Sequence, residues 1–375
     1  MKASTNPFYF REIAIDAPFC DREEELSQLV SYAKGKANVV LFSPRRYGKT
    51  SLVRRVQKRL AEEGALIIFA DFFGISSIDE MASRLAKAVF EVAKPEQSLF
   101  EKVIKTIKSF RPVLKPDETG GMALSVEPTT SRKVGADVFE DTVSSLREFI
   151  ESSDRLVHIA LDEFQEIAQL KDALKIEGIM RSHIQRFNAS CFFIGSRRRL
   201  LLSMFNDRRR PFFQSAINYE LKVLPHDDLV KFISDLFALR GKVCDISKSD
   251  IISKRVSQHP YYSQKLSFFV YEVTDKNVDD GNISEAQEML LESERSLFEA
   301  IVQGLAPQQI ALLKAIAREP AASIFSIDYM KRNELGSTGG VQGALKKLTL
   351  LDLIEQDPEK CWKVVDPVFS IWLKR

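Results

Sequence analysis

Five short apolar runs, separated by stretches with helical spacing, constrain the fold of this chain more than any other feature. The runs are residues 38–42, 65–70, 156–161, 191–196 and 217–221. Between the first two, residues 49–63 place apolar side chains at helical spacing. Apolar strands that alternate with helices form a parallel sheet covered on both faces. We therefore predict an α/β fold with a five-stranded parallel sheet, in which His158 is the strand position least suited to burial.

The first strand leads into a loop whose sequence is typical of phosphate binding. In such loops, backbone N–H groups converge on a phosphate at a helix N-terminus. Gly48 lets the backbone approach the phosphate, Lys49 would reach the β- and γ-phosphates, and Thr50 would place its hydroxyl on Mg²⁺. Ser43 replaces the usual first glycine, so this position must take a permitted φ. The predicted site for ATP or ADP comprises Ser43, Pro44, Arg45, Arg46, Tyr47, Gly48, Lys49, Thr50 and Ser51.

The third apolar run ends in two acidic residues, Asp162 and Glu163. An acid at the tip of a neighbouring strand can hold the water shell of Mg²⁺, and a second carboxylate can polarise an attacking water. We predict that Asp162 binds the metal with Thr50 and that Glu163 is the catalytic base; the alternative is a solvated turn. Ser196 ends the next strand, where it either faces the γ-phosphate or is a simple strand-end hydroxyl.

Three segments are expected along the chain. Residues 1–224 would form the nucleotide-binding core, with a helix at residues 95–110 and then a hairpin inserted at about 111–134, where prolines and glycines separate two β-like runs. A structureless loop is the alternative to the hairpin. Residues 225–302 are helical throughout, as in a lid domain. Residues 303–375 have the order of elements of a winged helix-turn-helix domain.

The charge balance argues against a dedicated nucleic-acid binder, because 54 Lys and Arg residues against 52 Asp and Glu residues give a net charge of +2. Any nucleic-acid surface must therefore be local. The four cysteines form no Cys-x-x-Cys pair, which favours neither a zinc site nor a disulfide scaffold. The sequence lacks the apolar core of a signal peptide and any run of the roughly 18 apolar residues that span a membrane. We expect a cytoplasmic protein with no membrane partner.

Several short motifs carry a resemblance to a known family. They are FCDREEEL at residues 19–26, SPRRYGKTSL at 43–52, LDEFQ at 161–165, GSRRR at 195–199, HPYYSQ at 259–264 and the ending VVDPVFSIWLKR. Together they resemble the archaeal-type ATPases of the STAND and AAA+ assemblage, which are related to the Orc/Cdc6 initiators. The resemblance spans almost the full chain. It implies a P-loop NTPase sheet of order 5-1-4-3-2, a helical lid and a C-terminal winged helix.

The resemblance also implies roles for residues outside the loop. Phe19 and Arg22 would lie against the adenine and ribose, Pro260 would sit where the lid touches the nucleotide, and His259 would lie near the phosphates. For His259 and Pro260 the alternative is a plain helix start, with the proline at the first helical position.

An arginine that acts in a neighbouring subunit is common among relatives, and this chain departs from that pattern. Arg208, Arg209 and Arg210 come slightly earlier than the usual position, where Ser215 stands. We predict Arg210 as the arginine finger. Otherwise these side chains, with those of residues 197–199, are solvated or bind an acidic partner, nucleic acid included.

Three functional hypotheses follow for a chain that binds ATP or ADP with Mg²⁺. The first is an ATPase that works as a nucleotide-controlled switch, with the winged helix as effector and a protein partner or self-association as readout. The second is an ATP-dependent DNA-binding protein of the initiator or transposition-regulator kind. Its DNA contacts would come from Lys331, Arg332, Lys346 and Lys347. The third is a non-hydrolysing nucleotide-binding scaffold, against which Glu163 argues.

Overall fold

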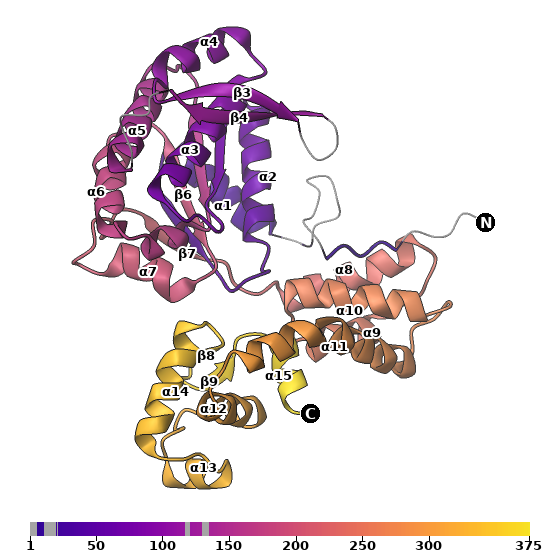
Figure 1. Cartoon of the computed structure of the whole chain (residues 1–375). Helices are drawn as coiled ribbons and strands as arrows, with labels where there is room; N and C mark the ends of the chain where they lie inside the picture. Colours follow the sequence, from indigo (N-terminus) through magenta and orange to yellow (C-terminus); the bar gives the residue numbers. More distant parts are fainter. Residues whose placement is uncertain (1–5, 11–19, 21, 117–120, 130–134) are drawn as a thin grey trace. The chain divides into compact units, whose positions relative to one another are not determined.

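The computed structural model describes residues 6–10, 20, 22–116, 121–129 and 135–375 (Figure 1). The chain divides into two compact units. Arg22–Lys222 is the α/β unit, and Val223–Arg375, together with the described residues before Arg22, is the helical unit. Each unit has its own cluster of buried apolar side chains. Within the described ranges, no helix is long and apolar enough to cross a membrane.

The α/β unit alternates strands and helices as the apolar runs predict. Its elements are α1 (Glu23–Lys34), β1 (Val39–Phe42), α2 (Lys49–Glu62), β2 (Leu66–Asp71), α3 (Ile78–Ala93), α4 (Gln97–Thr106), β3 (Phe110–Pro116), β4 (Met122–Pro128), α5 (Ala136–Glu151), β5 (Val157–Asp162), the 3-10 helix η1 (Phe164–Gln169), α6 (Ala173–Ile184), β6 (Ser190–Gly195), α7 (Arg198–Asn206) and β7 (Ile217–Glu220). The predicted α/β class is confirmed.

Five of these strands form a parallel sheet in the order β2-β5-β6-β1-β7. Counted among themselves in chain order, they run 5-1-4-3-2 from β7 to β2; the labels differ from these numbers because β3 and β4 lie outside the sheet. The carboxyl ends of parallel strands meet at one edge, which is where ligands bind in open α/β sheets. The order places β6 between β1, which leads into the loop, and β5, which ends in Asp162.

Helices cover both faces of this sheet. Successive residues of a strand point to opposite faces. In β2, Ile68 joins the apolar cluster that includes α3, α5 and α6. The ring of the next residue, Phe69, instead lies 3.4 Å from the guanidinium carbon of Arg54 on α2. Coverage on both sides explains why every residue of β1, β5 and β6 is buried.

His158 corrects the expectation that one position of β5 would escape burial. Its side chain is fully buried, and Nδ1 lies 2.7 Å from the hydroxyl of Ser190 on β6. Burial lowers the pKa of His158 to about 3, so the imidazole is neutral. The expectation was wrong because a neighbouring hydroxyl satisfies one ring nitrogen inside the sheet.

The inserted segment is a hairpin. β3 and β4 pair antiparallel from Phe110 opposite Pro128 to Pro116 opposite Met122. Leu124 and Val126 are buried with Phe110 in the apolar cluster of the α/β unit, so the hairpin is anchored to it. Residues 117–120 and 130–134 of the predicted insertion lie outside the described residues.

The predicted helix at residues 95–110 is too long. α4 ends at Thr106 because Ile107 takes an extended conformation, with φ −83° and ψ 90°, and buries its side chain. The chain then enters β3 at Phe110. A tertiary contact of one apolar side chain therefore overrides the local helical pattern.

The helical unit contains the segment predicted as a lid and the winged helix domain. Its elements are α8 (His226–Leu239), α9 (Ile246–Arg255), α10 (Pro260–Val273), α11 (Asp280–Gln303), α12 (Pro307–Arg318), α13 (Ile327–Arg332), α14 (Thr338–Leu350), β8 (Ile354–Gln356), β9 (Trp362–Val364) and α15 (Pro367–Leu373). β8 and β9 form an antiparallel hairpin, the wing. Three helices followed by this hairpin confirm the winged helix-turn-helix order.

The N-terminal residues correct the predicted domain boundaries. They were expected to belong to the domain of residues 1–224, but the described residues 6–10 group with the helical unit. The buried ring of Phe8 lies 5.0 Å from the ring of Phe237 and 6.4 Å from that of Tyr271, measured between centroids. The amide of Asn6 donates to the carbonyl of Phe268 at 3.1 Å. Burial of an aromatic ring thus decides where this segment packs.

Candidate functional site

The loop between β1 and α2 has the backbone conformation that phosphate binding at a helix N-terminus needs. Gly48, the N-cap of α2, has φ 84°, a left-handed conformation that glycine adopts without strain. Because a glycine N-cap has no side chain to bond the first N–H groups of α2, these donors are left for a ligand. Ser43 is fully buried and does not have a positive φ, so a side chain is tolerated there.

Lys49 folds back over this loop. Its Nζ donates to the carbonyl of Pro44 at 2.9 Å, the carbonyl of Ser43 at 3.1 Å and the Ser43 hydroxyl at 3.3 Å. Desolvation by burial lowers the pKa of Lys49 to about 8, although the charges of Glu163 and Asp162 oppose the shift. A buried ammonium group bonded to neutral oxygens is suited to accept an anionic phosphate in their place.

Thr50 and Asp162 meet at the edge of the sheet, as predicted from their positions after β1 and at the end of β5. The Thr50 hydroxyl donates to Oδ2 of Asp162 at 2.6 Å, and the backbone N–H of Glu163 donates to Oδ1 at 2.9 Å. Burial raises the pKa of Asp162, and these two hydrogen bonds counter the shift. Hard oxygen donors of this kind fit Mg²⁺, which binds through one or two protein oxygens plus phosphates and waters.

Glu163 follows in a left-handed conformation, with φ 48° and ψ 39°, immediately before η1. The hydroxyl of Ser196, at the end of β6, donates to its two carboxylate oxygens at 3.0 and 3.3 Å. The amide Nε2 of Gln165 donates to Oε2 of the same carboxylate. Ser196 therefore lies beside the predicted base, and Gln165 is a contact to which the sequence had given no role.

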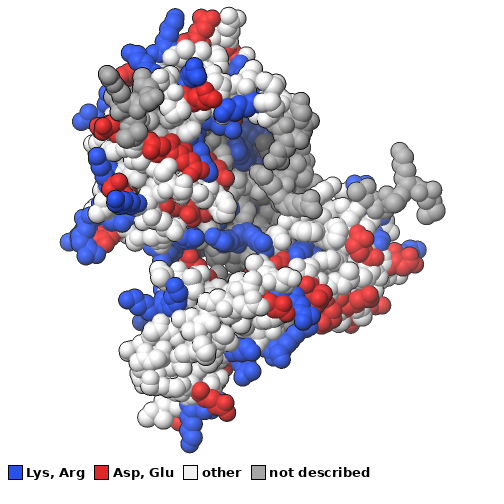
Figure 2. Space-filling model, in the orientation of Figure 1, with Lys and Arg blue, Asp and Glu red and all other residues white. Residues whose placement is uncertain are grey.

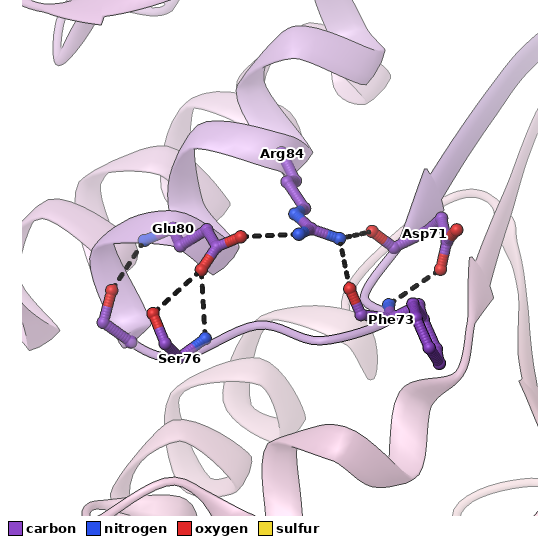
Figure 3. A network of polar contacts seen from close by, with 6 residues as sticks. Asp71, Phe73, Ser76, Glu80 and Arg84 are labelled. Carbon is purple, nitrogen blue, oxygen red and sulfur yellow. Dashed lines mark hydrogen bonds and ion pairs between the residues drawn. The ribbon is translucent and has the colours of Figure 1, made fainter.

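A second network that sequence reasoning missed fixes the loop after β2, next to Asp162 (Figure 3). The guanidinium of Arg84 donates to the carbonyls of Asp71 and Phe73 at 2.9 and 2.8 Å and to Glu80 at 2.5 Å. Asp71 is the register partner of Asp162 and accepts the backbone N–H of Phe73 at 2.8 Å. The sequence did contain a signal for this contact, because Asp71 is an acid at the end of the strand that pairs with β5. The network places the carboxylate of Asp71 beside Asp162 at this edge of the sheet.

Arg22 is almost fully buried at the start of α1, in a left-handed conformation with φ 82°. Its guanidinium donates to the carbonyl of Lys222 and to Glu25, each at 2.7 Å. These contacts tie the entry of the α/β unit to the chain that leaves β7. Phe19, its predicted companion at the adenine, lies outside the described residues.

Two of the three arginines at residues 208–210 pair with acids of their own unit. Both Nε and Nη2 of Arg210, the predicted finger, donate to the carboxylate of Glu177 on α6, the Nε bond being 3.0 Å long. Burial raises the pKa of Glu177 to about 7, although Arg210 opposes the shift. Arg209 is exposed and pairs with Asp207 at 2.8 Å. Arg210 thus neutralises a buried acid, which a finger would have to release.

Within the helical unit, His259 is the N-cap of α10 and Pro260 its first residue, so the predicted helix start is present. The imidazole of His259 lies against the ring of Tyr262 in a tilted arrangement, with centroids 4.9 Å apart. In the winged helix, Lys331, Lys346 and Lys347 are exposed. Arg332 pairs with Glu319 at 2.6 Å. The family role of His259 and Pro260 at a nucleotide stays a prediction.

Two family models match this sequence. A model described as "ATPase domain predominantly from Archaea" matches residues 19–239, and one described as "probable winged helix domain" matches residues 296–375. A comparison with curated protein sequences finds no significant match.

Solved structures share this fold at low sequence identity. A Walker-type ATPase of Pyrococcus abyssi is 18% identical, with 98% of this chain and 100% of that chain covered and a TM-score of 0.71. The Aeropyrum pernix ORC2 protein, solved as ADPNP–ADP complexes, is 16% identical over 97% of this chain and 94% of its own, with a TM-score of 0.58. The ORC1 protein of the same organism, in complex with DNA, is 14% identical over 100% and 97%, with a TM-score of 0.52. Because the model of the ATPase domain spans more than half of the chain, the chain belongs to the family of ATPase domains found predominantly in Archaea, and a winged helix domain follows at residues 296–375.

Proposed function

We propose that this chain is a Mg²⁺-dependent ATPase that converts ATP and water to ADP and phosphate and acts as a nucleotide-controlled switch. The observation that carries the proposal is the arrangement at the sheet edge. Lys49 there is bonded to neutral oxygens only in the part of the chain described, while Thr50 and Asp162 are joined by a 2.6 Å hydrogen bond. Lys49 suits the phosphates, and the pair of Thr50 and Asp162 suits the metal. A bound metal would neutralise charge on the phosphate oxygens.

Glu163 supports turnover rather than binding alone. Its carboxylate is held by the neutral donors Ser196 and Gln165, so it keeps the acceptor capacity that a general base needs toward a water molecule. A scaffold that binds nucleotide without hydrolysis would have no use for a second oriented carboxylate beside the metal-binding acid.

Turnover and binding should separate in Glu163→Gln. We expect this variant to bind ATP with Mg²⁺ as tightly as wild type while its kcat falls at least about a hundredfold, the usual range for loss of a general base. Phosphate release and calorimetric titration measure the two quantities on the same preparation. Equal turnover by both proteins would remove the enzymatic assignment and leave the scaffold hypothesis.

The switch role is supported by a contact between two motifs of the helical unit. The hydroxyl of Tyr262, in the HPYYSQ motif, donates at 2.5 Å to Asp366, which caps α15 in the C-terminal motif. A change at the start of α10 can therefore reach the winged helix directly. Hydrogen exchange of α14 and α15 in Glu163→Gln should differ between the ATP-bound and ADP-bound forms. Identical exchange in both would argue against the switch.

DNA binding is the second candidate, favoured by the exposure of Lys346 and Lys347 on α14 together with Lys331 on α13. The face of the winged helix seen in Figure 2 is otherwise largely uncharged, so few phosphate contacts are available there. If these lysines bind DNA, the variant Lys346→Ala/Lys347→Ala should reduce the slope of log affinity against log salt by about 2. An unchanged slope would exclude this helix as the DNA contact.

A further inference from the structure

The buried amide of Gln165 contacts the carboxylate of Glu163. Its side chain, on η1 two residues after Glu163, is fully buried. A carboxylate has acceptors only, so the atom that faces Glu163 must be the amide nitrogen rather than the amide oxygen. The contact is therefore a hydrogen bond from Nε2 to Oε2 of Glu163.

The other end of the same amide has been left without a partner. Oε1 of Gln165 is buried and accepts no hydrogen bond from any described residue. A buried polar atom without a partner destabilises the fold, and such exceptions call for an explanation at each position. Here the amide gives up one bond in order to direct its N–H at the carboxylate.

Gly195, at the end of β6, makes room for this arrangement. A Cβ at this position would overlap Oε1 of Gln165 and lie 3.0 Å from Cδ2 of Leu201. The φ of Gly195 lies outside the left-handed region, so the backbone conformation alone does not require glycine. What position 195 requires is the absence of a side chain, because Gln165 fills that space.

The geometry also gives the direction in which Glu163 is held. Ser196, at the end of β6, donates a hydrogen bond to the carboxylate, and β6 lies between β5 and β1 in the sheet. The carboxylate is thereby drawn toward the strand that leads into the phosphate-type loop. Gln165 acts on the same oxygen from η1, so the two neutral donors fix its orientation without pairing it with a cation.

We propose that Gln165 is a positioning residue for the attack on ATP: it orients the carboxylate of Glu163 for the incoming water, and Gly195 exists to admit it. The proposal rests on the proposed ATPase function and adds one residue to its machinery. In this role Gln165 acts on the carboxylate of Glu163 and not on the nucleotide. Its removal should lower kcat while leaving ATP binding intact, because it acts only through Glu163.

The primary test compares Gln165→Leu with wild type in steady-state ATP hydrolysis. We expect kcat to fall about tenfold, the effect of one lost orienting hydrogen bond in the transition state, with KM and ATP affinity within about twofold of wild type. Gln169→Leu is the matched control, since Gln169 lies on the same η1 helix, is exposed and bonds Glu166 at 3.0 Å. A Gln165→Leu protein with the kcat of wild type would overturn the proposal.

A second variant separates positioning from a merely structural role. In Gln165→Glu, the amide donor is replaced by a carboxylate of nearly the same size, which only accepts hydrogen bonds and repels the carboxylate of Glu163. We expect kcat to fall at least about tenfold, with ATP affinity within about twofold of wild type, because only the orientation of Glu163 is lost. A Gln165→Glu protein with the kcat of wild type would contradict the role, and this variant decides the matter if Gln165→Leu does not fold.

Gly195 provides an independent arm. Gly195→Ala should lower kcat in the wild-type background but add little to Gln165→Ala, because the clash disappears with the side chain. If the two substitutions lower kcat additively, Gly195 does not serve to make room for Gln165. If wild type itself fails to hydrolyse ATP, the proposed function fails first, and that result is distinct from equal rates in wild type and Gln165→Leu.

Discussion

Two buried lysines, one in each unit, differ in what surrounds them. Lys49 of the α/β unit donates to carbonyl and hydroxyl oxygens of its own loop. Lys265 of the helical unit donates to the carboxylate of Glu294 at 2.6 Å, with both side chains almost fully buried. A buried cation needs an anionic partner. Lys265 has its anion within the chain, whereas we propose that Lys49 receives one from a ligand.

The neighbouring aspartates repeat this difference. Burial raises the pKa of both Asp162 and Asp366, and hydrogen bonds oppose the shift in each. Asp366 is enclosed by Tyr262 and the backbone N–H groups of Val368 and Phe369, so its bonds complete the cap of α15. Asp162 shares its oxygens with the Thr50 hydroxyl at the sheet edge. The network around Asp366 stabilises the fold, whereas we propose that the one around Asp162 binds the metal.

The largest effect should come from breaking the closed pair. Lys265→Met leaves Glu294 buried without its cation, which should lower the free energy of unfolding of the helical unit by about 3–5 kcal/mol. Urea denaturation followed by circular dichroism measures this. Lys248→Met is the control, because Lys248 forms an exposed pair with Asp280 and should leave the midpoint nearly unchanged. Similar midpoints for the two variants would contradict the comparison.

Arg210→Met tests a third buried charge, in the α/β unit. The variant leaves the buried carboxyl of Glu177 without its arginine, and the free energy of unfolding should fall by about 1–3 kcal/mol at neutral pH. Arg209→Met, which removes an exposed partner of Asp207, should have little effect. Were both variants equally stable, the pair would not be structural and Arg210 would be free for another role.

The pH dependence of the same site has a definite sign. Because burial raises the pKa of Glu177 to about 7, the folded protein binds this proton more tightly than the unfolded chain. The contribution of Glu177 to stability should therefore fall as pH rises from about 4.5 to about 7. Thermal unfolding across this range should show a flatter profile in Glu177→Gln than in wild type. Parallel profiles would exclude a raised pKa.

Hydroxyl removal sharpens the contrast between the two aspartates. Tyr262→Phe and Thr50→Val each delete one hydrogen bond to a buried carboxyl, which should cost about 1–2 kcal/mol of stability. Only Thr50→Val should also weaken the dependence of ATP affinity on Mg²⁺. Titrations at two Mg²⁺ concentrations separate the variants, and an equal loss of Mg²⁺ dependence in both would contradict the assignment.

Local patterns were sufficient to predict the strands, the loop and the order of the winged helix. Apolar runs fix β1, β5 and β6 because both faces of the sheet are covered. The loop is one contiguous segment, so its chemistry is visible in the sequence. Asp162, at a strand end, could be brought to Thr50 by topology alone, although 112 residues separate them.

Contacts that depend on packing could not be predicted this way. Arg210 and Glu177 lie 33 residues apart and meet only because α6 packs beside the segment after α7. Gln165 depends on the missing side chain at Gly195, and Phe8 finds its place on α8 and α10 rather than in the α/β unit. The periodicity of the sequence does not predict such pairs, since each follows from how separate elements are placed in three dimensions.

The central claim is that Lys49 awaits the phosphates of ATP, and titration of ATP with Mg²⁺ into wild type and Lys49→Met tests it most directly. Loss of a charge-assisted bond to phosphate should weaken affinity about ten- to a hundredfold. Stability should not fall, because the variant removes a buried cation whose partners are the neutral oxygens of its loop. Lys49→Met that binds ATP as tightly as wild type would contradict the account.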